Sequence, residues 1–244
     1  MNSWKFSVFQ GYLASAGKMF WTKLTAMYRL SPFQGDHFHA ASLIRDYPFP
    51  SLVSIDESGL PFITRLPLHL ELGAQDVSGQ QPFTLLGDVA RGNPHWRYSK
   101  ARPQAIVTFL GPHAYLSPQV YPDLAQVPTW NYLAVHCIVQ ATLIKEAAVK
   151  DMLLQKLIAD HEPDYANRWR RQDTEYAQKM LAGIVAFELQ VTNFQCKLKV
   201  NQHRPEAFSA TQSMYANGSD DEQALARWMK RIGLSGTPKT LRGS

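Results

Sequence analysis

The sequence predicts a β-rich α+β fold, in which antiparallel strands close into a barrel, helices pack around it and a helical segment forms the C-terminal tail. Residues 48–144 alternate apolar and polar side chains with a period of two, and tight-turn sequences separate the runs. Antiparallel strands of this kind usually close into a barrel. Amphipathic patterns of helical period follow after residue 146. With 244 residues and 45% hydrophobic composition, the chain can bury a sizeable core.

The predicted strands begin directly after Pro48. The sequence Asp56-Glu57-Ser58-Gly59 forms a hairpin loop between the first two of them. Period-two alternation places one set of side chains of the longest strand on a single face, namely Leu133, Val135, Cys137, Val139, Ala141 and Leu143. The predicted strands span residues 49–55, 62–70, 83–90, 104–110, 113–117, 129–144 and 183–192.

Helices are predicted where the hydrophobic period changes or where capping residues occur. Asn93-Pro94 begins a short helix, because Asn is a good N-cap and Pro suits the first helical position. A longer helix carries an apolar stripe of Val149, Met152, Leu153 and Leu157. The predicted helices span residues 95–100, 146–161, 173–181 and 222–232, and a further one starts at Pro205.

We divide the chain into four parts. Residues 1–26 carry three Lys and no acidic residue, and polar residues and glycines interrupt their apolar positions, which argues against a secretory signal. We expect them to form an extension outside the fold, upstream of a natural start at Met27; a weak amphipathic surface helix is the alternative. Residues 27–204 form the barrel domain, residues 205–234 a helical segment and residues 235–244 a flexible tail.

Charge and cysteine content limit the function classes. The formal charge of +5 and the pI near 9.2 suit nucleic acid or a phosphate-bearing ligand, although a mildly basic surface explains them equally well. Cys137 and Cys196 lie far apart in apolar stretches, so we expect two buried free thiols and a cytoplasmic protein. No run of 18 apolar residues and no metal-ligand spacing occurs, so neither a membrane span nor a metal site is predicted.

Four stretches combine Pro and Gly with polar and aromatic residues. Such segments interrupt the regular secondary structure that residues serving only the core would keep. A ligand-binding rim explains them better than turn chemistry alone. They are Thr64-Arg65-Leu66-Pro67, Ala90-Arg91-Gly92-Asn93-Pro94-His95-Trp96, Gly111-Pro112-His113-Ala114-Tyr115-Leu116-Ser117-Pro118 and Val127-Pro128-Thr129-Trp130-Asn131-Tyr132.

Together with Gly183-Ile184-Val185-Ala186-Phe187-Glu188 and Lys197-Leu198-Lys199-Val200-Asn201-Gln202, these stretches resemble the PaiB-type FMN-binding negative transcriptional regulators. The resemblance covers nearly all of residues 27–234. It implies an FMN-binding split barrel, a homodimer with its cofactor clefts at the subunit interface, and a regulatory role. Ten cofactor-binding candidates follow: Thr64, Arg65, Leu66, Arg91, Asn93, His113, Tyr115, Trp130, Asn131 and Lys197.

Chemistry suggests a role for several candidates. Arg91 lies just before a predicted helix start, which favours a phosphate contact, although an ion pair at the barrel rim is the alternative. Trp130 and Asn131 could supply a flat wall and an amide, or Trp130 could pack in the core. Lys197 could reach the phosphate from the partner subunit, but we expect it to face water. His113 and Tyr115 could donate protons near a flavin.

Two positions depart from the family pattern. Arg65 stands where members usually have His after Thr, and Asp88 stands where the Gly-His-x-Ala-Arg strand usually has His. An Arg can bind phosphate, whereas a carboxylate repels it unless it pairs with Arg65 or Arg91. The two changes could compensate each other, or FMN binding could be weak or lost.

Three functions remain open at this stage. A flavin-binding regulator without turnover comes first, and no catalytic residue is assigned. A flavin-dependent oxidoreductase of the split-barrel class is the alternative. DNA is a third possibility, but a helix-turn-helix needs a turn of about three to four residues, and residues 162–172 separate the candidate helices. We expect the basic cluster of Arg168, Arg170 and Arg171 to form a solvated face rather than to contact phosphate groups of DNA.

Overall fold

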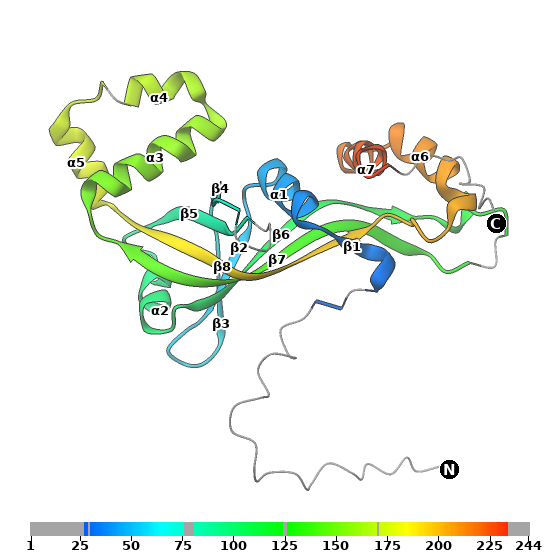
Figure 1. The fold of residues 1–244 in the computed structure, drawn as a ribbon, viewed down its shortest axis with the longest axis horizontal. Coiled ribbons are helices and arrows are strands. Elements are labelled where there is room, and N and C mark those ends of the chain that lie inside the picture. The colour runs from blue at the N-terminus through cyan, green and yellow to red at the C-terminus, as the bar shows by residue number, and fades with distance from the viewer. Residues whose placement is uncertain (1–26, 29, 76–80, 124–125, 170, 234–244) are drawn as a thin grey trace, which may run out of the picture.

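The computed structural model describes residues 27–28, 30–75, 81–123, 126–169 and 171–233. The predictions for residues 1–26 and 235–244 therefore lie outside the described residues. Within them, the predicted antiparallel sheet is confirmed as one sheet in the order β3-β2-β6-β7-β8-β5-β4, with β1 paired to β8 (Figure 1). The strands are β1 (Gln34–Gly35), β2 (Ser51–Ile55), β3 (Pro61–Arg65), β4 (His69–Leu72), β5 (Phe83–Ala90), β6 (Gln104–Leu116), β7 (Thr129–Ile144) and β8 (Ile184–Lys199).

Strand β6 is continuous where a break was expected, and β8 is longer than predicted, whereas β7 has the predicted bounds. The predicted strands 104–110 and 113–117 form a single strand, β6, with a register shift between Leu110 and His113. Gly111 lies at this shift, and a Cβ there would stand 2.7 Å from a methyl carbon of Leu43. The absence of a side chain at Gly111 thus lets the helix that carries Leu43 pack against the strand.

The core is built by alternation, as predicted. Residues Leu133, Val135, Cys137 and Val139 on β7 are at most 1% exposed, so this face of the strand is buried. Cys137 and Cys196 are both buried, as predicted, and burial raises the pKa of Cys137 above its usual range.

A helix that was not predicted, α1 (His37–Asp46), covers one end of this core. The Asp36 side chain accepts a hydrogen bond from the backbone N–H of His39, and the His39 ring reaches back to Asp36, which together form a capping box. Ala40, Leu43 and Ile44 are completely buried against the sheet.

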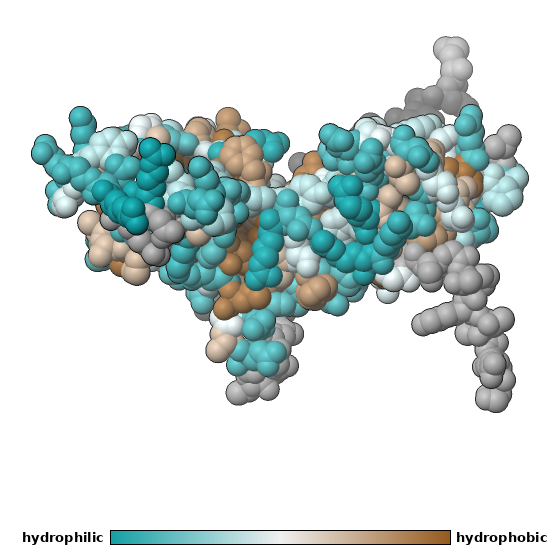
Figure 2. All heavy atoms as spheres, turned by 90° about the horizontal axis from the view of Figure 1, so that it is seen from above, coloured by the Kyte–Doolittle hydropathy of each residue, from teal (hydrophilic) through white to brown (hydrophobic). Residues whose placement is uncertain are grey.

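Apart from α2, the remaining helices form two groups on the same side of the sheet as α1 (Figure 1). Leu153 and Leu157 of α3 pack on Leu86 of β5, whereas Val149 and Met152 from the same predicted stripe are partly exposed. Figure 2 looks onto this side and shows hydrophilic residues over most of the two helical groups, with hydrophobic residues between them. The groups are α3 (Ala147–His161), α4 (Pro163–Trp169) and α5 (Thr174–Ala182), and η3 (Pro205–Ala207), α6 (Phe208–Ala216) and α7 (Asp220–Arg231).

The predicted loop between α3 and α5 is wrong, because α4 occupies most of it and leaves four residues between α4 and α5. The short helix α2 (His95–Ala101) is confirmed, and the Asn93 side chain accepts a hydrogen bond from the backbone N–H of His95. Short 3₁₀ turns, η1 (Ser31–Phe33) and η2 (Pro118–Val120), complete the elements. No helix within the described ranges combines the length and apolar character needed to cross a membrane.

Candidate functional site

Nine of the ten predicted cofactor residues fall into two separate groups. The first, here the Thr64 group, consists of Thr64, Arg65, Leu66, Arg91 and Asn93 near α2. The second, the Trp130 group, consists of His113, Tyr115, Trp130 and Asn131 at the far end of the long strands. The tenth, Lys197, lies between the groups, because it pairs with Ala134 of β7, which pairs with Leu110 of β6. Thr64 pairs with Leu52, which pairs with Val107, whereas Tyr115 lies eight residues further along β6. At roughly 3.3 Å per residue, about 25 Å of strand separates the two groups.

Thr64 belongs to a small buried polar network on the α2 side of β3. Its Oγ1 lies 2.8 Å from Nδ1 of His95 and 3.3 Å from Nδ2 of Asn93, which donates to it. Nε2 of His95 lies 2.9 Å from Oγ of Ser54. Burial lowers the pKa of His95 to about 4, so the ring is neutral at pH 7. Sequence reasoning missed His95, although it lies in the conspicuous Ala90–Trp96 stretch.

Arg91 bridges the turn from β5 to the start of β8. Its Nε donates to the carbonyl of Ala182 at 2.7 Å and its Nη2 to that of Ile184 at 3.3 Å. Its backbone N–H also donates to the carbonyl of Gly183, at 2.8 Å. The side chain of Arg91 is exposed and forms these hydrogen bonds to main-chain carbonyls instead of the ion pair that was the alternative.

The two family departures do not form the compensating pair that was considered. Among the described residues, neither Arg65 nor Arg91 forms an ion pair with Asp88. Asp88 lies two residues after Leu86 and therefore on the same face of β5, the face that packs on α3. Burial raises the pKa of its carboxyl. Leu66 is 2% exposed, so only its backbone could face a ligand, and its N–H donates to the carbonyl of Pro50.

Two neighbouring rows of side chains cross the face of the sheet opposite the core, here called the outer face. Paired residues of antiparallel strands project to the same side, so the register defines both rows. One row is apolar and consists of Ile63, Val53, Ile106 and Ile138. The next row is polar and consists of Arg65, Ser51, Thr108, His136 and Gln195.

The two rows together match a flat ligand with an apolar body and a polar edge. Four members of the polar row are partly exposed, and Arg65 is exposed. His136 has a lowered pKa because of burial and the charge of Lys197. At about 4.8 Å between strands, Arg65 and His136 lie three strands, or roughly 14 Å, apart.

The Trp130 group presents aromatic rings to solvent. Trp130 is 53% and Tyr115 48% exposed, so core packing does not explain Trp130. The two rings meet edge to face with centroids 6.3 Å apart, and His113 lies 6.2 Å from Trp130. Asn131 is completely buried instead, and its Nδ2 donates to the hydroxyl of Tyr215 at 3.1 Å.

The expectation that Lys197 faces water is wrong. Its side chain is 7% exposed, and its Nζ donates to the carbonyl of Tyr28 at 2.8 Å. The ammonium also lies 5.6 Å from the ring centroid of Tyr28 and 5.1 Å from that of Tyr132, within the range of cation–π attraction. The cause is that residues 27–28 cross β8, where the backbone N–H of Met27 donates to Gln195.

Two of the cavities found among the described residues lie near the long strands. One, of about 380 Å³, lies beside Lys199 and Asn131, and another, of about 340 Å³, lies between His37 and Phe194. The part of the chain that the structure covers holds no group of three or more His, Cys, Asp or Glu residues that could bind a metal ion.

Comparisons with known proteins agree with this architecture. The family model described as "Putative FMN-binding domain" matches residues 27–193. The Bacillus subtilis (strain 168) "Protease synthase and sporulation protein PAI 2" is 30% identical over 166 residues, covering 68% of this chain and 76% of that protein.

Solved structures show the same split-barrel fold at low identity. The flavocytochrome Anf3 from Azotobacter vinelandii has a TM-score of 0.52 and 16% identity, covering 68% of each chain. The FAD and heme binding protein from Mycobacterium smegmatis has a TM-score of 0.53 and 16% identity, covering 67% of this chain and 71% of that one. From the family match over residues 27–193 and the relative of 30% identity, we conclude that this chain belongs to the PaiB-type FMN-binding family.

Proposed function

We propose that the protein binds FMN in clefts between two copies of the chain and acts as a flavin-binding regulator rather than as an enzyme with turnover. The observation that carries the proposal is the pair of rows on the outer face, in which Ile63, Val53, Ile106 and Ile138 lie beside the polar row that begins at Arg65. An isoalloxazine needs an apolar wall, and its pyrimidine edge and its phosphate need hydrogen bonds and cations.

The exposed apolar residues support the homodimer. Ile63 is 60% and Leu110 56% exposed on the outer face, and Trp130 adds a large ring at 53%. An apolar surface of this extent is typical of an interface. In a two-fold dimer a residue i of one chain contacts a residue j of the other, and j contacts i in return, so the Trp130 group of each chain can approach the Thr64 group of the other. A second copy could thus unite two groups that about 25 Å of strand keeps apart in one chain.

In this arrangement Arg65 and Arg91 supply the positive charge for the phosphate. The main chain of residues 64–66 flanks the cofactor, and Trp130 of the second copy forms the flat wall. The flavin, when bound, would supply electron or hydride transfer at its ring. Nothing in the described residues forms an acid, base and nucleophile trio beside it, which is why we favour regulation over turnover.

The visible spectrum of the purified protein and the mass of any released chromophore test the cofactor directly. FMN added to cofactor-free protein should lose fluorescence on binding, and riboflavin should bind more weakly because it lacks the phosphate. Equal affinity for FMN and riboflavin would contradict the predicted phosphate contacts. Absence of any flavin binding would contradict the proposal as a whole.

Adding NADH or NADPH to the flavin-loaded protein under anaerobic conditions distinguishes the oxidoreductase alternative from a regulator without turnover. We expect no reduction of the flavin beyond the rate of free FMN with the same nicotinamide. Multiple turnovers with an added electron acceptor would favour the enzyme.

For the regulatory role we expect an indirect route or an unusual DNA surface. The four-residue spacing between α4 and α5 is short enough for a helix-turn-helix, and Arg168 and Arg171 are exposed beside it. Fluorescence anisotropy with duplex DNA at two salt concentrations decides the point. Binding that depends on sequence and weakens in Arg171→Gln would establish direct recognition, whereas weak binding to all sequences would leave the indirect route.

A further inference from the structure

The cavity of about 380 Å³ at the far end of the sheet combines positive charge with buried amide groups. It lies between η1, the adjoining ends of β7 and β8, and the turn that precedes η3. Lys199, His203 and Arg204 line it, and none of the described residues that line it is acidic. Its volume lies within the range of small-molecule sites.

Lys199 contributes a cation that no carboxylate neutralises among the described residues. Its Nζ donates to Oγ1 of Thr129 at 2.6 Å and to the carbonyl of Trp130 at 2.7 Å, which leaves one of the three ammonium N–H groups available. Burial and the charge of Lys197 lower the pKa of Lys199. A cation partly removed from water without a counter-ion is stabilised by an anion that binds beside it.

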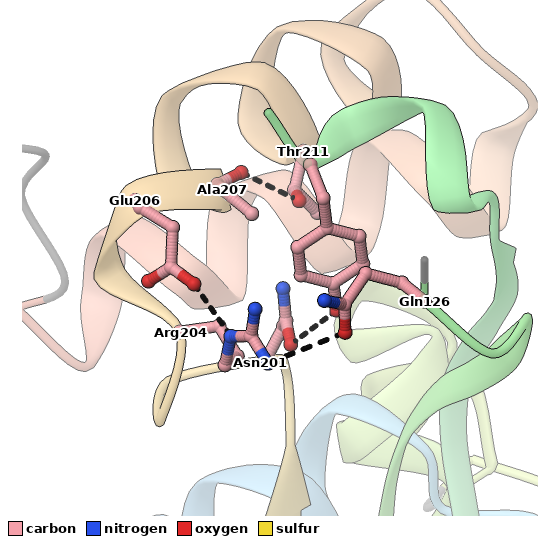
Figure 3. A network of polar contacts seen from close by, with 7 residues as sticks. Gln126, Asn201, Arg204, Glu206, Ala207 and Thr211 are labelled. Carbon is pink, nitrogen blue, oxygen red and sulfur yellow. Dashed lines mark hydrogen bonds and ion pairs between the residues drawn. The ribbon is translucent and has the colours of Figure 1, made fainter. Parts of the chain in front are cut away.

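Arg204 approaches the same cavity from the turn after β8 (Figure 3). Its Nε pairs with Oε1 of Glu206 at 2.5 Å, and its Nη1 donates to Gln126 at 3.3 Å. The guanidinium also lies over the ring of Tyr121, 5.1 Å from the ring centroid. Burial and the charges of Arg204 and Lys199 together lower the pKa of His203, so both cations lie close enough to this ring to disfavour its protonation.

Two buried amide side chains in the lining have unpaired atoms. Asn201 is 3% exposed, and its Oδ1 accepts a hydrogen bond from the hydroxyl of Tyr121 at 2.9 Å, but its Nδ2 has no partner among the described residues. Asn131 is completely buried and its Oδ1 is likewise unpaired. A buried donor or acceptor without a partner is rare in native structures and calls for a bound group that satisfies it.

We propose that this cavity binds the phosphate group of a small organic phosphate, at a site distinct from the flavin cleft on the outer face. Lys199 and Arg204 provide the charge, and Asn201 provides an uncharged donor. Phe33, which is 7% exposed, belongs to the apolar part of the wall, where an organic body of the ligand can pack.

Phenyl phosphate is a suitable probe, because it joins one phosphate to one flat apolar ring. Isothermal titration calorimetry should show that it binds the parent protein, and that phenol, which lacks the phosphate, does not bind. Lys199→Gln and Arg204→Gln should each lower the affinity for phenyl phosphate by about tenfold or more, since each removes one charge-assisted contact. Lys179→Gln, which removes an exposed cation on α5, should leave the affinity unchanged.

Thermal melts of every variant show whether it folds, and the charge-conserving Lys199→Arg should retain part of the binding. Equal affinity in the parent, Lys199→Gln and Arg204→Gln would overturn the proposal, as would no binding of phenyl phosphate at millimolar concentration. Repeating the titration with saturating FMN separates the two sites. Competition by FMN would make the cavity part of the flavin site and overturn a distinct one, while binding of phenyl phosphate in a protein that binds no FMN would defeat only the proposed function.

Discussion

Oγ1 of Thr64 lies 2.8 Å from Nδ1 of His95, and this contact joins the predicted cofactor strand to a completely buried histidine. The other ring nitrogen lies 2.9 Å from Oγ of Ser54. The ring therefore bridges β2, β3 and the start of α2. The ring is neutral in the folded protein at pH 7, because burial disfavours the imidazolium form.

The first prediction concerns the pH dependence of stability. The pKa of His95 is lowered from 6.5 to about 4, so between these values the unfolded chain takes up a proton that the folded protein does not. The stabilisation is fully present above pH 6.5 and is lost as the pH falls towards 4. Between pH 7 and pH 5 this one group should lower the free energy of unfolding by about 2 kcal/mol.

Urea unfolding of the parent and of His95→Gln at both pH values measures this difference. The variant will be less stable at pH 7, because it loses a buried hydrogen-bonding group, but its stability should fall less on acidification. Parallel loss of stability in both proteins would show that His95 is not the responsible group.

The second prediction concerns Arg91. Arg91→Ala should leave the barrel folded and lower the affinity for FMN by about ten- to a hundred-fold, because one charge-assisted phosphate contact contributes about 1.5–3 kcal/mol to binding. Arg97→Ala, on the exposed surface of α2, is the matched control and should bind FMN like the parent. If Arg91→Ala instead loses stability with unchanged FMN affinity, the hydrogen bonds to Ala182 and Ile184 are its whole role.

The third prediction concerns the dimer. Light scattering at micromolar concentration should show two copies for the parent, and Ile63→Lys should shift the protein towards monomer, because it places a charge in the apolar row of the outer face. Leu60→Lys is the control, since Leu60 is equally exposed, at 63%, but lies in the turn of the same hairpin. A monomeric parent would rule out the shared cleft.

The fourth prediction concerns the two family departures. Replacing Arg65 and Asp88 by His together restores the family pattern and should raise FMN affinity above that of the parent, because it removes a partly buried carboxylate that forms no ion pair among the described residues. The two single variants, titrated with FMN under the same conditions, assign the gain to one position or to both. Weaker binding in Arg65→His alone would indicate that the guanidinium itself holds the phosphate.

Much of the sheet could be predicted because its signal is local. The bounds of β5 and β7 match the prediction, since each strand alternates strictly and ends at turn residues. The two helices that were missed carry weaker signals. The apolar stripe of α1 is short and interrupted by histidines, and α4 has seven residues inside a polar segment.

The site was harder to predict, because its geometry depends on contacts between residues far apart in the chain. Lys197 is buried only because Tyr28 crosses it, 169 positions away in the sequence. The involvement of His95 depends on Ser54, 41 positions away, which no local pattern reveals. The outer rows likewise require the register of five strands. Alternation alone specifies which side of the sheet a residue faces, but not which residue of the neighbouring strand lies beside it.

Strand β7 runs for 16 residues without interruption from Thr129 to Ile144, and it pairs with both neighbours, β6 and β8, from Tyr132 to Gln140. At about 3.3 Å per residue it is a stiff rod of roughly 50 Å that holds the Trp130 group at a set distance from α2. Closing a cleft by bending this rod would break ladder hydrogen bonds on two neighbours at once. In the proposed dimer, adjustment to a ligand would therefore come from sliding or rotating one copy against the other, which would convert occupancy of the cleft into a change of quaternary geometry.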